Sequence, residues 1–326
     1  NGNVKVNYNP GNYNLYLSYG IRKDNRDRTN LDTRRQIDTA SQSSYYNGNL
    51  LSYASPLSNM IQLSMDYHLD EENQFGISGN YFVNIFTRTD NLNAVLLDDA
   101  SVRAREYERN RYDPEYEKEY GYTTYVEHQF PKEGHKLRFE FTGTQSPEEE
   151  DNHFTNIFLF PGSPTNYDNT LIKQADNKNQ ISLEYSNRLT ERSTLEAGYT
   201  GQFNRADLDF RAESFDATRQ QFVRDSVKTN QFLYDGTIHA AYGTYKELFG
   251  AFGFQAGMRI EQSNIKSDLV TRDSIFENSY VNLYPSLHLS YKMSTAAELQ
   301  LSYSRRTNRP RGEDLNPFPE YRDPRN

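Results

Sequence analysis

Two pairs of an aspartate and a histidine come closest to a catalytic arrangement in this sequence. Asp66 precedes His68 by two residues, and Asp235 precedes His239 by four, so each pair shares one face of an extended strand. A carboxylate beside an imidazole can support general acid–base catalysis, and a hydrolase can be imagined on either pair. A strand that faces water carries such polar side chains in any case, and we therefore predict no catalytic residue and no enzyme.

The sequence gives no better support for a metal site or a cofactor-binding site. The six histidines never approach the spacing of metal ligands, and cysteine is absent. The acidic run from Glu148 to Asp151 is expected to be a solvated loop, because the sequence shows no converging oxygens for Ca²⁺. Gly253 and Gly257 fall on one strand face, where they ease backbone curvature rather than cradle a phosphate. We predict no metal site and no cofactor.

One apolar patch lies in a polar surrounding. It runs from Ile157 to Phe160 and is followed by Pro161-Gly162 and then by Tyr167. Phe158, Phe160 and Tyr167 are therefore candidate contacts to a ligand or partner. Packing of the same side chains against neighbouring loops is the simpler interpretation.

The elements that position these residues are strands, and the clearest signal runs from Ser279 to Tyr303. Apolar residues occupy alternate positions of the first half: Val281, Leu283, Leu287, Leu289, Tyr291 and Met293. Polar residues such as His288 stand between them, a period of two that only an extended chain produces. The alternation resumes after Ser294-Thr295-Ala296, which predicts a hairpin. Pro285 cannot donate to a ladder and predicts a bulge.

Similar runs recur along the whole chain and indicate about twelve strands. Short turns, such as Asp70–Asn73, alternate with long polar stretches, such as Asp90–Asp113 and Ser146–Thr170, which we interpret as loops. A change of phase at Asn204–Asp207 predicts a bulge there or the end of the strand's apolar zone. A soluble sandwich scatters its loop lengths over both ends, whereas an outer-membrane barrel has short turns on one side and long loops on the other.

The composition agrees with a barrel whose inner face is in contact with water. Lys136, Arg138 and Glu140 alternate with Leu137 and Phe139, and so many charges on one face cannot all be buried. Hydrophobic residues make up 35% of the chain, and the mean hydropathy is −0.93. Such polarity suits a barrel, because only alternate residues of each spanning strand touch lipid. The net charge of −9, without basic clusters, argues against nucleic acid as a partner.

The end of the chain carries a family resemblance. NLYPSLHLSYKMS and the segment Leu299–Phe318, LQLSYSRRTNRPRGEDLNPF, resemble the signature segment of the outer-membrane β-barrel family related to TonB-dependent receptors, abundant in Bacteroidetes. The similarity covers Tyr234 to Asn326 well and extends more loosely to the start. Its most specific residues are Arg309, Pro310, Leu315, Asn316, Pro317 and Phe318.

The resemblance implies a fold and a function. The expected fold is all-β, with residues 1–326 forming part of one antiparallel transmembrane β-barrel of about 22 strands. An N-terminal plug and further C-terminal strands are expected outside this segment. The implied activity is import of a nutrient, a glycan, peptide or metal chelate, across a Gram-negative outer membrane. Expected partners are outer-membrane lipid, the plug and the remaining strands, with TonB and a surface lipoprotein as further candidates. The alternative is an outer-membrane structural or interaction protein without transport.

Overall fold

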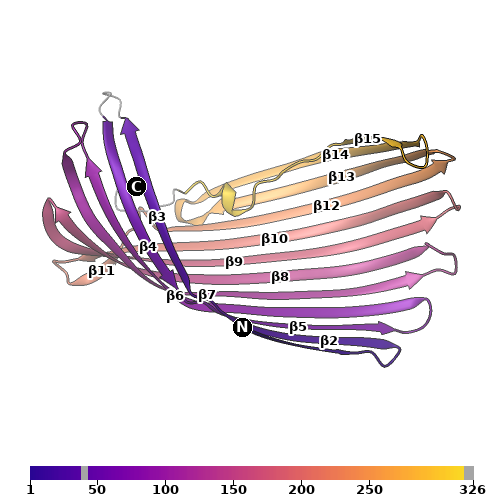
Figure 1. Cartoon of the computed structure of the whole chain (residues 1–326), viewed down its shortest axis with the longest axis horizontal. Helices are drawn as coiled ribbons and strands as arrows, with labels where there is room; N and C mark the ends of the chain where they lie inside the picture. Colours follow the sequence, from indigo (N-terminus) through magenta and orange to yellow (C-terminus); the bar gives the residue numbers. More distant parts are fainter. Residues whose placement is uncertain (38–42, 319–326) are drawn as a thin grey trace.

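The computed structural model describes residues 1–37 and 43–318, and its fifteen strands form one antiparallel sheet (Figure 1). The main path of the sheet is a series of neighbouring strands: β1 (Gly2–Tyr8), β2 (Tyr13–Lys23), β5 (Leu57–His68), β6 (Asn73–Leu97), β7 (Arg103–Gln129), β8 (Lys136–Phe160), β9 (Gly162–Arg188), β10 (Ser193–Asp216), β12 (Asn230–Phe249), β13 (Phe252–Leu269), β14 (Ser274–Lys292) and β15 (Glu298–Ser304). Within the described residues the sheet is open, because β1 and β15 each pair with one neighbour.

Three strands lie off this path. β3 (Arg26–Ile37) and β4 (Ser43–Ala54) form a hairpin that pairs with the far half of β6, and β11 (Gln221–Arg224) pairs with β10. Two short breaks separate β3 from β2 and β4 from β5, and they lie side by side, because the Asp24 amide donates to the Pro56 carbonyl over 3.1 Å. Beyond these breaks β3 and β4 turn away from β2 and β5 and run beside the far half of β6 (Figure 1).

The long loops predicted from the sequence are wrong. β6 continues to Leu97 and β7 begins at Arg103, while only Pro161 separates β8 from β9. The predicted loops 90–113 and 146–170 are therefore largely paired strand. These stretches carry polar residues on both faces of the strand, so the sequence shows no alternation of apolar and polar positions. They still form strands, because backbone pairing does not require apolar side chains. The strands are therefore longer than predicted but not more numerous along the main path, which has the expected twelve; the three strands off this path bring the total to fifteen.

The predicted bulge at Pro285 is absent. Pro285 pairs with Met258 and the register on either side is continuous. Its carbonyl accepts a bond from the Arg305 amide, so the edge of Pro285 that lacks an N–H faces away from β13. No ladder bond to β13 is therefore lost. The stretch Asn204–Asp207 also pairs without interruption with both of its neighbours, which leaves the end of the apolar zone as the explanation for the phase change.

The sheet has one apolar face and one polar face. Val126, Phe139, Leu183 and Tyr199 form a continuous row across four neighbouring strands, and all four are exposed. On the other face the Tyr125 hydroxyl donates to Asp66 over 2.7 Å. A continuous exposed apolar row is the pattern of a surface that contacts lipid. None of the described residues belongs to a helix with the length and hydropathy of a bilayer-spanning helix.

The strands are much longer than the membrane requires. β7 has 27 residues, whereas a tilted strand crosses the hydrocarbon core with about 9–11. The apolar face ends well before the far end of β8, because Glu149 on that face pairs with Lys173 at 3.1 Å and accepts a bond from the Tyr116 hydroxyl. An ion pair does not face acyl chains. The far parts of β7, β8 and β9 therefore stand outside the membrane.

The segment after β15 folds back over the polar face. It contains the short 3₁₀ helix η2 (Glu313–Leu315) and lies over β12, β13 and β14 (Figure 1). Gly312 lies so close to the Tyr234 ring that an added Cβ would approach it to 2.6 Å. Phe232 and Ala240 on the same face of β12 are almost fully buried. These apolar side chains of β12 therefore lie on the inner, polar face of the sheet and not on the face that contacts lipid.

Candidate functional site

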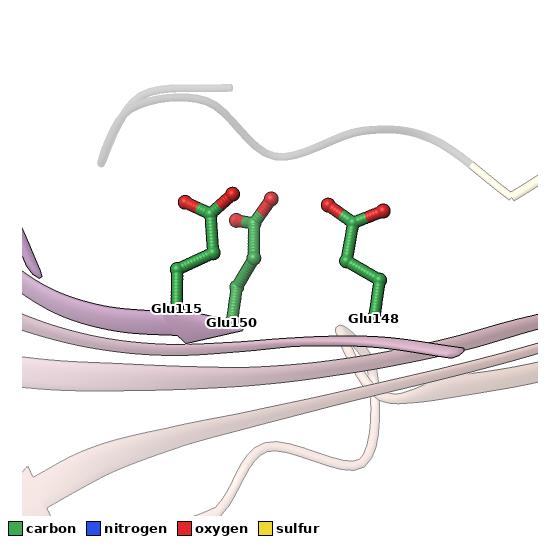
Figure 2. A group of neighbouring side chains, drawn as sticks. All are labelled: Glu115, Glu148 and Glu150. Atoms are coloured by element: carbon green, nitrogen blue, oxygen red, sulfur yellow. The ribbon is translucent and has the colours of Figure 1, made fainter. Parts of the chain in front are cut away.

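Three glutamates from two adjacent strands converge on the polar face. Glu115 of β7 pairs directly with Glu150 of β8, and Glu148 lies two residues from Glu150. Because strand side chains alternate between faces, all three point to the same side (Figure 2). One carboxylate oxygen from each lies within 4.8 Å of the others. Like charges at this distance repel unless a proton or a cation intervenes.

A fourth carboxylate lies next to this glutamate cluster (Glu115, Glu148 and Glu150). Asp113 is 0% exposed, and neither of its side-chain oxygens accepts a hydrogen bond from any residue that the structure describes. Its nearest cation, the Nη2 of Arg111, is 3.6 Å away, and the same guanidinium contacts Asp90 at 2.9 Å. Arg88 pairs with Glu115 at 2.8 Å. The two arginines thus leave a surplus of negative charge.

The titration of these groups reflects their surroundings. Burial raises the pKa of Glu115 to about 8, and Glu150 and Asp113 add to the effect, although Arg88 opposes it. Burial also raises the pKa of Asp113, with Glu150 adding to it. The pKa of Glu148 is raised by burial and then by Glu117 and Glu150. Simultaneous ionisation of all the carboxylates in this cluster is therefore unfavourable.

The sequence shows only part of this cluster. The acidic run Glu148–Asp151 was expected in a loop, but it lies in β8, where Glu148 and Glu150 share the polar face and Glu149 faces the other way. Glu115 carries no signal of its own, because its proximity depends on the register between β7 and β8. The alternating acids Asp113, Glu115 and Glu117 are the one hint that the sequence offers.

The three aromatic candidates do not form one site. Phe158 lies in β8, not in a loop, and packs against a small buried cluster around Tyr46 and Tyr107. Phe160 is exposed at the end of β8, and Tyr167 is exposed in β9. Phe158 thus follows the simpler interpretation of packing within the protein, and a ligand role for the other two stays a prediction.

The family-signature residues lie together in the segment that covers the polar face. Arg309 pairs with Glu261 and donates to the Tyr284 hydroxyl over 3.1 Å. Asn316 accepts a bond from the Asn230 side chain at 3.4 Å. The rest of the set belongs to the same segment: Pro310, Leu315, Pro317 and Phe318. These contacts give the segment a structural role on the inner side of the sheet.

The two aspartate–histidine pairs have other partners. Asp66 accepts its bond from Tyr125, across β5 to β7. His239 lies 2.6 Å from the Tyr199 hydroxyl, on the exposed apolar face, and Asp235 lies 4.0 Å from Arg205. His239 therefore faces the lipid side instead of the wet side that the sequence indicated.

A long antiparallel sheet with an apolar outer row and a charged inner face defines the wall of an outer-membrane β-barrel. The sequence profile of the outer membrane protein beta-barrel family matches residues 128–326, and the chain belongs to this family. The protein is located in the outer membrane.

Solved structures show limited similarity. The outer membrane protease OmpT from Escherichia coli is 10% identical, with a TM-score of 0.29, and the match covers 91% of this chain and 99% of that one. The ferric citrate transporter FecA in the unliganded form is 14% identical, with a TM-score of 0.48. That match covers 90% of this chain, which spans 42% of the FecA chain. A comparison with curated proteins finds no match.

Proposed function

We propose that this chain forms part of the wall of a TonB-dependent transporter that imports a scarce nutrient through the outer membrane. The observation that carries the proposal is the open, charged inner face of the sheet. Barrels of about eight strands close around their own side chains, whereas larger ones enclose an aqueous lumen. A main path from β1 to β15 that remains open, with ion pairs such as Arg138–Glu140 on its inner side, supports a wide lumen.

The rest of the assembly follows from this wall. Edge strands β1 and β15 present unpaired backbone groups within the described residues, and lipid does not tolerate such groups, so in this proposal both edges are paired in the complete barrel. A total of about 22 strands is the number that the family resemblance implies. A plug fills the lumen and couples to TonB, and a surface lipoprotein is a candidate partner at the outer end. The substrate is a glycan, a peptide or a metal chelate.

The proposal gives this chain no catalytic role. Its two aspartate–histidine pairs are engaged elsewhere, with Asp66 bonded to Tyr125 and His239 bonded to Tyr199 on the lipid side. A hydrolase would need its pair to face water and substrate, which the lipid-facing Asp235–His239 pair does not do, while the inward-facing Asp66 is bound to Tyr125. These contacts support a transport protein over an outer-membrane enzyme.

Uptake by living cells tests the proposal. The gene is deleted and then restored, and cells are supplied with radiolabelled oligosaccharides, peptides and metal chelates one at a time. We expect uptake of one class to fall in the deletion strain, to return with the gene, and to stop when a protonophore removes the proton gradient that energises TonB. Unchanged uptake of every class, combined with altered envelope integrity or cell aggregation, would replace transport with the structural or interaction role.

A further inference from the structure

The glutamate cluster has the geometry of a cation site. Ca²⁺ binds oxygen ligands at about 2.4 Å, so two oxygens on one ion lie at most about 4.8 Å apart. The oxygens of Glu115, Glu148 and Glu150 lie within 4.8 Å of one another. Their carboxylates therefore fit around a single ion without any movement of the backbone. The ligands come from two strands held in fixed register, which limits the entropy lost on binding.

Asp113 gives a second, independent indication of a ligand. It lies two residues from Glu115 on the same face of β7, next to the cluster but outside the group of three whose oxygens lie within 4.8 Å of one another. Its carboxylate is fully buried, and neither oxygen accepts a hydrogen bond. A buried carboxylate without hydrogen bonds is costly, and natural proteins retain one chiefly where something else compensates its charge. Arg111, at 3.6 Å and shared with Asp90, compensates it only in part.

The resident arginines do not fill the site. Arg88 contacts Glu115 at 2.8 Å, which uses one oxygen of one glutamate. Among the described residues, Glu150 receives only a long bond of 3.5 Å from the Asn152 amide. Glu148 and Glu150 stand side by side on the polar face (Figure 2), and no lysine or arginine of the described residues forms an ion pair with either.

We propose that Glu115, Glu148 and Glu150 bind a calcium ion on the inner face of the barrel wall, just outside the membrane. Carboxylate oxygens are the ligands that hard divalent cations prefer, and calcium accepts an irregular set of six to eight oxygens more readily than magnesium does. The bound ion cross-links β7 to β8 where these strands leave the apolar zone. It thereby stabilises the extramembrane part of the sheet. The inference does not depend on which nutrient the barrel transports.

Calcium titration of the purified full-length protein in detergent tests the site. Isothermal titration after chelator treatment measures the affinity for Ca²⁺, and terbium luminescence, excited through nearby tyrosines, reports the same site optically. We expect one saturable Ca²⁺ site per chain. Glu148→Gln and Glu150→Gln each keep the side-chain shape but remove a charged ligand, and we expect each to weaken binding by about tenfold or more.

The chain offers a matched control in Glu149. It lies between the two ligands in sequence but faces the opposite side, next to Lys173. Glu149→Gln should leave the Ca²⁺ affinity unchanged, while all variants keep the heat-modifiable gel migration of a folded barrel. Absence of Ca²⁺ binding at millimolar concentration, or an equal loss in all three folded variants, overturns the proposal. Tighter binding of Mg²⁺ than of Ca²⁺ overturns the choice of ion.

Discussion

Arg109 provides the sharpest test of how the extramembrane part of the sheet is held together. Its guanidinium forms two bonds to Asp168, of 2.9 and 2.8 Å, and a third of 2.6 Å to Asn156. It also stacks 3.7 Å above the centroid of the Phe154 ring. Arg109 thus links β7 to β8 and β9, and its side chain is only 10% exposed. Arg109→Ala removes the arginine side of this contact and leaves Asp168 without the one ion-pair partner that it has among the described residues.

The expected cost follows from the burial of the pair. Removal of one partner of a buried ion pair costs about 3–5 kcal/mol. The Asp168 side chain is 26% exposed, so water can partly solvate it, and we take the lower end, about 3 kcal/mol. Since every 1.4 kcal/mol is a factor of ten, local opening of the strand ends should rise on the order of 100-fold. The membrane-spanning part, which Arg109 does not touch, should be unaffected.

Hydrogen exchange of the folded protein in detergent measures this local opening. Amides of β8 and β9 around Asn156 and Asp168 should exchange on the order of 100-fold faster in Arg109→Ala. Arg211→Ala is the control, because Arg211 pairs with Glu213 but is half-exposed, and such pairs contribute about 0–1 kcal/mol. A change below tenfold in Arg109→Ala, or an equal change in both variants, would refute the reasoning.

Three further predictions concern the inner face. Arg309→Ala should release the segment after β15 and leave Glu261 with one arginine partner fewer, at a cost of about 2–4 kcal/mol, visible as faster proteolysis between β15 and η2. Gly312→Val should release the same segment, because its side chain collides with Tyr234, whereas Gly162→Ala, with open space around it, should be silent in the same assay. Removal of calcium with a chelator should increase hydrogen exchange at the β7–β8 pairing near the glutamate cluster and leave the short turns unchanged.

The alternation of residues predicts the membrane-spanning strands well. Leu137 and Phe139 of β8 alternate with charges, and the structure confirms both the strand and the separation of its faces. This works because lipid and water impose opposite demands on successive side chains. The same logic fails from Ser146 onward, where water lies on both sides of the strand and neither face needs apolar residues. Sequence reasoning therefore mistakes a paired strand for a loop.

The candidate site is harder to predict, because it depends on register. Glu115 and Glu150 are 35 positions apart in the sequence and meet only because β7 and β8 pair in one alignment. A shift by one residue would bring Glu149 to the polar face in place of Glu150. The inward orientation of Ala240 is equally hidden, because it follows from the register of β12 with β10, in which Ala240 pairs with Thr200 on the face opposite Tyr199. Neither fact can be obtained from local periodicity.

The length of β7, β8 and β9 affects how large partners would meet this protein. Strands of 25 to 27 residues extend for about 80–90 Å, at about 3.3 Å per residue. Their far ends are paired strands, and these hold the connections between strands well outside the lipid headgroups. A macromolecule that docks there would meet a backbone whose conformational entropy was already lost during folding, so little further ordering would oppose the association.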